Sequence, residues 1–240
     1  EPLQYIAIIM IVYASVKVIF EDNMLSILCY LSIMAMGLML LGISYGSDAV
    51  ILATISYLFI HIIYKSLLSI SVVSLIDQTG IYDCRNLKKI NSNIILTGFI
   101  ISITMMINVP AISSFYIKSS ISHAFAGTPV YFIIIFLSFM TVLALPWKQY
   151  FTANESFDIK LNIPTKLSLL FMSIALTIVG ITGEYLPVLS HIETFKEISL
   201  ASMDNLKQII IILAALFLAL FWKTKRRITK PINFTESIGD

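Results

Sequence analysis

Charged residues are scarce in this sequence. Asp, Glu, Lys and Arg make up 12% of its 240 residues, hydrophobic residues make up 58%, and the mean hydropathy is +0.91. Soluble domains carry about a quarter charged residues, because a surface that faces water needs them. This shortage of charge excludes an ordinary soluble domain and indicates that much of the surface contacts lipid.

Net charge and cysteine are equally limited. The formal net charge of +2 is too small to indicate a nucleic-acid partner. Cys29 and Cys84 lie far apart, with no second Cys or His at metal-ligand spacing. The sequence therefore predicts neither a disulfide framework nor a zinc site, and we expect no metal and no cofactor.

Long apolar runs dominate the chain. The hydrocarbon core of a bilayer is about 30 Å thick, so a run of about 20 apolar residues can cross it as a helix. Such runs cover approximately 3–20, 24–43, 49–76, 94–118, 129–151, 165–190 and 205–222. Lipid offers no partner to unpaired backbone groups, so each run should be helical. The sequence predicts an all-α, polytopic transmembrane bundle of about seven helices, forming a single domain over 1–240.

The fourth run contains a proline. Pro110 lacks the N–H that a helix interior needs, so the expected helix over 94–126 should be broken at this residue. Irregular backbone at membrane depth is tolerated only beside protein or a water-filled cavity. The break therefore marks a candidate cavity.

Basic residues gather in alternate loops. The connections after the third, fifth and seventh expected helices hold Arg85, Lys88, Lys89, Lys148, Lys160, Lys166, Lys223, Lys225, Arg226, Arg227 and Lys230. The opposite connections 44–48 and 119–128 hold none. Cytoplasmic loops are enriched in Lys and Arg. We therefore expect a multi-pass protein of the cell inner (plasma) membrane, with the N-terminus of this segment outside and the C-terminus in the cytoplasm.

Two ionisable residues lie inside the third run. A Lys near the middle of a membrane helix, such as Lys65, costs about 2.5–3.5 kcal/mol on insertion scales. Residues four apart share a helix face, so Tyr57, His61 and Lys65 should form a polar stripe. With water between them, such groups can relay protons, because imidazole titrates near neutral pH. The alternative is that His61 and Lys65 only hydrogen-bond a neighbouring helix or extend toward the membrane surface.

Lys118 is a third candidate for the relay. A helix broken at Pro110 could present Lys118 to a cavity, although a Lys that extends to the membrane surface would have the same spacing. Lys17, near the end of the first run, is expected to extend in that way. The acids in the loops are scattered and form no catalytic or metal-binding pattern: Asp77, Asp83, Glu155 and Asp158.

Four stretches resemble the motifs of one family, in the same order. Residues 28–33 read L-C-Y-L-S-I and, with Gly37, are similar to L-A-Y-S-S-I-x-x-x-G, while residues 61–68 read H-I-I-Y-K-S-L-L and are similar to H-A-F-F-K-A-L-L. Residues 79–87 match T-G-x-x-D-x-R-x-L, and residues 110–118, P-A-I-S-S-F-Y-I-K, resemble P-P-L-x-G-F-x-S-K. The chain thus resembles the antiporter-like membrane subunits of respiratory complex I and the D-type subunits of Mrp multisubunit cation/proton antiporters.

This resemblance implies roles for the candidate residues. It makes Lys65 the central lysine of a proton path, His61 its relay histidine and Lys118 the exit-side lysine, with Tyr57 as possible support. It implies sister membrane subunits as partners, and transport of H⁺ with Na⁺ or K⁺ as possible further ions. The part over 1–150 resembles the second of two inverted repeats, and 151–240 would add C-terminal helices and a basic cytoplasmic tail.

The chain also departs from the family pattern. Tyr57 stands where a second His often precedes the first, Leu25 and Ser26 replace a basic pair, and Ser114 replaces a Gly. No residue here supplies the Glu–Lys pair of the first repeat, so we expect this chain to be the C-terminal half of a longer protein. Its opening on Glu1 and Pro2 is consistent with that expectation.

Several functions stay open at this point. The first is a proton- and cation-translocating subunit of a multisubunit cation:proton antiporter, which is a transporter and not an enzyme. The second is a proton-pumping subunit of an NADH:quinone oxidoreductase-like complex, and the third is an assembly scaffold that does not conduct. An intramembrane enzyme is disfavoured, because it would need a cluster of acids, His or Cys at one membrane face.

Overall fold

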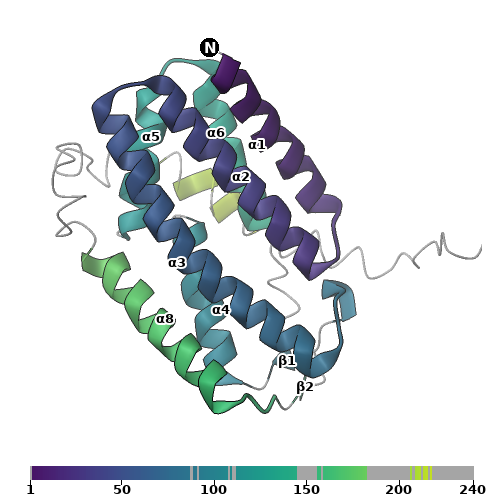
Figure 1. Cartoon of the computed structure of the whole chain (residues 1–240). Helices are drawn as coiled ribbons and strands as arrows, with labels where there is room; N and C mark the ends of the chain where they lie inside the picture. The colour runs from purple at the N-terminus through teal and green to yellow at the C-terminus, as the bar shows by residue number, and fades with distance from the viewer. Residues whose placement is uncertain are drawn as a thin grey trace, which may run out of the picture.

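The computed structural model describes residues 2–86, 89–90, 92–107, 109, 112–144, 156–157 and 159–182, with scattered positions between 206 and 217. In chain order its helices are α1 (Pro2–Phe20), α2 (Met24–Tyr45), α3 (Asp48–Thr79), α4 (Asn93–Met106), α5 (Ser113–Ala124), α6 (Pro129–Ala144) and α8 (Ile163–Thr182). A 3-10 turn covers Cys84–Asn86, and the two-residue strands β1 (Lys89–Ile90) and β2 (Ser156–Phe157) pair in parallel. Figure 1 shows a bundle of helices, which confirms the all-α prediction.

The first three helices are separated by short turns with clear sequence signals. The Asn23 side chain accepts hydrogen bonds from the backbone N–H groups of Leu25 and Ser26, at 2.9 and 3.3 Å, and so caps α2. Gly46 ends α2 and Gly80 ends α3, at φ values of 79° and 66°. Glycine adopts such left-handed angles without the steric cost that other residues incur. These signals fix where the chain reverses.

The surface of the bundle is that of a membrane protein. Within the described residues, α1, α2, α3 and α8 are each long and apolar enough to cross a membrane. On the outer helix α8, Phe171 is 71% exposed and Ile181 72% exposed. Apolar faces of this kind are stable against lipid and not against water. At about 1.5 Å per residue α3 is about 48 Å long, so this helix exceeds the hydrocarbon core.

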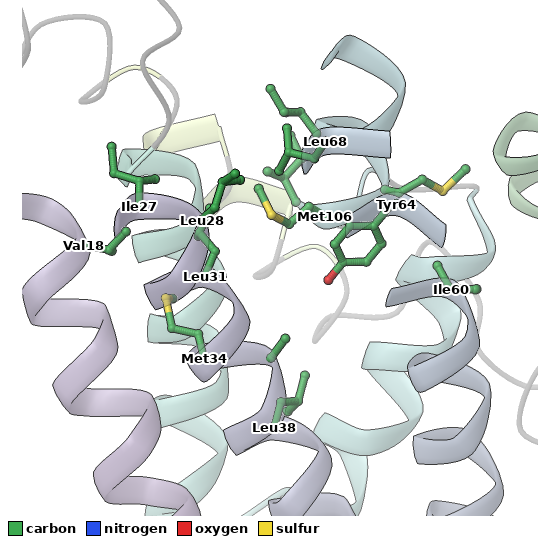
Figure 2. Packing of buried hydrophobic residues seen from close by; sticks show 14 of the residues in the cluster. Val18, Ile27, Leu28, Leu31, Met34, Leu38, Ile60, Tyr64, Leu68 and Met106 are labelled. Carbon is green, nitrogen blue, oxygen red and sulfur yellow. The ribbon is translucent and has the colours of Figure 1, made fainter. Parts of the chain in front are cut away.

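Helix α3 lies at the centre of the fold. It packs against α2, α4, α5 and α8, while α1 packs against α2 and α6 (Figure 1). Gly37 allows α1 and α2 to approach closely: a Cβ there would lie 2.8 Å from Ile11 Cγ1 and 3.1 Å from the Ala7 carbonyl oxygen. Small residues serve this purpose at helix contacts in membranes. Figure 2 shows the buried apolar cluster that joins α2 and α3.

The fourth expected helix is broken, as the proline predicted. Helix α4 ends at Met106 and α5 begins at Ser113, so the chain changes course between them. Pro110 itself lies outside the described residues. The sixth expected helix, 165–190, starts earlier, at Ile163, and is described to Thr182. Most of the seventh expected helix, 205–222, lies outside the described residues, as does the basic tail from Lys223.

The expected orientation can be tested by labelling single cysteines in a background where Cys29 and Cys84 are replaced by Ser. Ala49→Cys, at the start of α3, should react with a membrane-impermeant maleimide added outside. Asn86→Cys and Lys225→Cys should react only after the membrane is opened, because the loop after α3 carries the basic residues. Ala49 and Asn86 are both exposed, so they form a matched pair at the two ends of one helix. The reverse labelling would overturn the orientation.

Candidate functional site

Three polar side chains of α3 form a hydrogen-bonded chain inside the bundle. His61 Nδ1 lies 2.7 Å from the Tyr64 hydroxyl, and the Tyr64 hydroxyl lies 3.2 Å from the Tyr57 hydroxyl. All three residues are buried, with Tyr57 and Tyr64 at 1% exposure and His61 at 8%. The His61 and Tyr64 rings meet edge-on, with centroids 5.0 Å apart. Proton donors and acceptors are therefore in contact along two turns of one helix.

Lys118 reaches this chain from α5. Its Nζ lies 5.3 Å from the centroid of the Tyr57 ring, within the range of a cation–π contact, and it donates a hydrogen bond of 2.8 Å to the Met106 carbonyl. Only 4% of Lys118 is exposed. The Lys118 amine is therefore directed into the bundle.

The break between α4 and α5 explains the partner of Lys118. In a continuous helix the Met106 carbonyl would accept a hydrogen bond from the N–H of the residue four positions later. That residue is Pro110, which has no N–H. The carbonyl is therefore left without a helical donor, and the Lys118 amine supplies the missing hydrogen bond. The N–H that proline lacks is thus replaced, at the Met106 carbonyl, by the amine of the lysine.

Lys65 points in a different direction from Tyr57. Its Nζ donates to the backbone carbonyl of Leu28 in α2, and its side chain is partly buried. At 3.6 residues per turn, positions four apart drift by about 40°, so Lys65 is turned by about 80° from Tyr57. Tyr57 consequently faces Lys118 of α5, while Lys65 faces α2. The expected polar stripe therefore curves around α3, with Tyr57 at the contact with α5 and Lys65 at the contact with α2.

Helix α5 carries an unusual number of buried polar residues: Ser113, Ser114, Lys118, Ser119, Ser120 and Ser122. Ser113 donates to the Val179 carbonyl of α8 at 3.0 Å. The buried hydroxyls of Ser114 and Ser119 have no hydrogen-bond partner among the residues that the structure describes. Ser114 lies one turn before Lys118, on the same face. The surroundings of Lys118 are thus polar, although they lie inside an apolar bundle.

Sequence reasoning missed Tyr64. The structure brings together Tyr57, His61 and Lys118, which the sequence singled out, and places the Tyr64 hydroxyl between the first two. A signal was present, because a residue seven positions after Tyr57 lies within about 20° of it on a helix. A stripe built on steps of four residues overlooks that position.

A second cluster lies in the loops at one end of α2 and α3. Potential ligand atoms of Asp22, Asp83 and Cys84 lie within 4.8 Å of one another. Backbone hydrogen bonds bring these distant segments together, from Met24 N–H to the Tyr82 carbonyl and from Cys84 N–H to the Asp22 carbonyl, both 2.8 Å. Spacing along the chain does not reveal such a cluster. Acidic groups of this kind are common without a bound ion, so the geometry alone assigns no metal.

Comparison with known proteins confirms the family that the motifs indicated. Residues 1–144 match the NADH:quinone oxidoreductase/Mrp antiporter transmembrane family, which is more than half of the chain. This chain belongs to that family. No curated protein matches the sequence closely.

Two solved structures have a similar fold. A chain of the membrane-bound sulfane sulfur reductase, an archaeal respiratory membrane complex, is 17% identical with a TM-score of 0.71, and the match covers 89% of this chain and 44% of that one. A chain of the Mrp complex from Dietzia sp. DQ12-45-1b is also 17% identical, with a TM-score of 0.67, covering 89% of this chain and 49% of that one. The chain thus spans about half the length of these relatives. At this identity the likeness concerns the fold.

Proposed function

We propose that this antiporter-family chain carries protons across the membrane as a subunit of a multisubunit cation:proton antiporter. The observation that carries the proposal is the setting of its two membrane lysines. Among the described residues neither Lys65 nor Lys118 is paired with a carboxylate, and each instead donates to a backbone carbonyl. A buried, permanently charged group would need a counter-ion to offset its desolvation. An amine can donate to a carbonyl with or without its extra proton, so these sites suit a group that exchanges protons.

The proposed path has an order set by the contacts. Lys65 holds a proton beside α2, His61 lies one turn earlier on α3, and Lys118 holds a proton beside the break between α4 and α5. Imidazole is a side chain that can both accept and donate a proton through its two ring nitrogens, which suits a relay. The other half of the path, in which the family has a Glu–Lys pair, would come from residues or subunits beyond this chain. Sister membrane subunits are therefore part of the proposal.

A second function is favoured by one of the two structural relatives. The sulfane sulfur reductase is described as a respiratory membrane complex, and the other similar structure is an Mrp complex. This chain resembles one chain of each complex in fold. The same lysines could carry protons driven by electron transfer instead of by a cation gradient. An assembly scaffold would keep the fold without using the lysines.

Proton movement in vesicles that contain the complete complex separates these functions. In an antiporter, an imposed Na⁺ or K⁺ gradient should change the pH of the vesicle interior, as measured with a pH-sensitive dye. A redox-driven pump should respond only when an electron donor and acceptor are added. If replacement of Lys65 leaves every such signal unchanged, the chain acts as a scaffold and the proposal is wrong.

Pro110→Ala tests the link between the helix break and transport. Alanine restores the N–H that can bond to the Met106 carbonyl and so competes with Lys118 for it. Because a hydrogen bond to a charged group is worth about 1.5–3 kcal/mol, we expect proton flux to fall by about tenfold. Pro129→Ala is the matched control, since Pro129 is the exposed first residue of α6, where proline costs no hydrogen bond. Equal flux in both variants would remove the functional meaning of the break.

A further inference from the structure

The hydroxyl of Tyr64 occupies the junction of the buried polar chain. Its oxygen contacts both His61 Nδ1, at 2.7 Å, and the Tyr57 hydroxyl, at 3.2 Å. The Tyr64 ring lies within the same buried cluster as Met106, whose carbonyl holds Lys118 (Figure 2). Tyr64 therefore combines a packed ring with a hydroxyl placed between two groups that exchange protons.

We propose that the hydroxyls of Tyr64 and Tyr57 form a bridge that carries protons between His61 and the Lys118 side of the site. The inference rests on the proposed function, because it names the route between two of the residues assigned to it. In the family motif over 61–68 the position of Tyr64 is a Phe. A ring is thus sufficient for packing at this position, and the added hydroxyl needs another explanation.

The hydrogen-bond directions suit such a bridge. When His61 is neutral with Nδ1 as the acceptor, Tyr64 donates to Nδ1 and Tyr57 donates to Tyr64. When a proton occupies Nδ1, His61 must donate, so Tyr64 donates to Tyr57 and the Tyr57 hydroxyl proton turns outward. The same three groups therefore have two arrangements that differ by one proton and by the direction of every bond.

The transfer conserves protons at each step. The proton on His61 Nδ1 moves to Tyr64 Oη as the original Tyr64 proton moves to Tyr57 Oη. In the same concerted step, the original Tyr57 proton leaves toward the neutral amine of Lys118. Both phenols end neutral, one proton has entered and one has left, and rotation of the two hydroxyls restores the starting directions.

The bridge is continuous at His61 and interrupted at Lys118. The Lys118 amine lies over the face of the Tyr57 ring and is held by the Met106 carbonyl. It must turn from the ring face toward the hydroxyl to accept the proton. Movement of one flexible lysine side chain would therefore complete or interrupt the route, while the two tyrosines stay packed at 1% exposure.

Removal of single hydroxyls from the complete complex in vesicles tests the bridge. Tyr64→Phe and Tyr57→Phe keep the rings, and each should lower proton flux by about tenfold or more. Because the two hydroxyls act in series, the double variant should conduct no more slowly than the slower single variant. Tyr13→Phe is the control, since Tyr13 is 52% exposed on the outer helix α1 and should conduct at the wild-type rate.

A spectroscopic signal separates a bridge from a structural hydrogen bond. The ¹⁵N signal of His61 Nδ1, isolated by replacing His123 and His191 with Gln, should shift in Tyr64→Phe because the nitrogen loses its partner. A smaller shift is expected in Tyr57→Phe, where the Tyr64 hydroxyl is still present. If Tyr64→Phe does not assemble, the flux and signal of Tyr57→Phe decide alone.

The outcomes distinguish this inference from the function on which it rests. Wild-type flux in Tyr64→Phe together with blocked flux in Lys65→Met would overturn the bridge and leave the proposed function intact. Normal flux in Lys65→Met would instead overturn the proposed function. If the flux losses of the two single variants multiply in the double variant, the tyrosines act separately and the bridge is rejected. An unchanged His61 signal in Tyr64→Phe would show that Tyr64 does not bond to Nδ1, and would also reject the bridge.

Discussion

Lys65→Met in the complete complex is expected to slow proton translocation by about 100-fold or more, which is the range for loss of a group that transfers protons. Methionine keeps most of the length and apolar volume of the lysine stem and removes the amine. The Leu28 carbonyl keeps a donor after the change, because the Ser32 hydroxyl also donates to it, at 3.0 Å. Membrane insertion and assembly should therefore survive while flux is lost.

Two further variants make the test of Lys65 specific. Lys65→Arg should also impair flux, because a guanidinium stays protonated and cannot release a proton. Lys17→Met is the matched control, since Lys17 is exposed near the end of α1, where its amine lies 5.9 Å from the Tyr13 ring centroid. A structural lysine at position 65 would give the opposite pattern, with Arg restoring flux and Met damaging assembly. That result would contradict the proposed relay.

Lys118→Met should block flux as strongly and should also lower stability. Unlike the Leu28 carbonyl, the Met106 carbonyl has no helical donor, because Pro110 lacks an N–H. Removal of the amine leaves this acceptor without a donor in the part of the chain that the structure describes, and an unpaired buried acceptor costs about 1–3 kcal/mol. The flux assay in vesicles and the thermal unfolding of the purified complex measure the two effects separately.

Lys118→Gln separates the two roles of this lysine. Glutamine is one atom shorter and keeps an N–H donor for the Met106 carbonyl, but it does not titrate. We therefore expect Gln to recover part of the stability lost in the Met variant and none of the flux. If Gln or Met conducts at the wild-type rate, Lys118 is a structural residue that closes the helix break.

The site illustrates how far spacing on one helix can predict a contact. Tyr57 and His61 were placed on one face by a step of four residues, and the structure has their rings 6.1 Å apart. Lys65 belongs to the same series, but the drift of the α-helix turns it to a different neighbour. Tyr64 follows a step of seven residues and was missed. Periodicity thus predicts a shared face over about one turn, and beyond that the neighbouring helices decide what each residue contacts.

The partner of Lys118 illustrates the opposite case, in which covalent structure was decisive. The missing N–H of Pro110 could be read from the sequence, and so could the unpaired carbonyl at Met106. The sequence did not show which donor would fill that place. Lys118 does so because α5, after the break, packs against α3.

The sequence by itself determined the class of this protein. The scarcity of charge and the length of its apolar runs require membrane helices, because lipid leaves no other way to pair the backbone. Asn23, Gly46 and Gly80 set the helix ends through local hydrogen bonds and backbone angles. The order of four short motifs indicated the family. The helix ends and each single motif depend on residues near one another in the chain, and the class depends on composition and on the length of the apolar runs.

Only the tertiary structure decided which polar groups meet. The contacts of Lys65 with Leu28, of Lys118 with Tyr57, and of the Asp22 loop with the Asp83 loop join segments that are distant in sequence. Such contacts depend on how helices pack and rotate against one another. In a membrane this packing rests on van der Waals contacts and interhelical hydrogen bonds between residues of different helices. The polar residues occupy the places that this packing leaves to them.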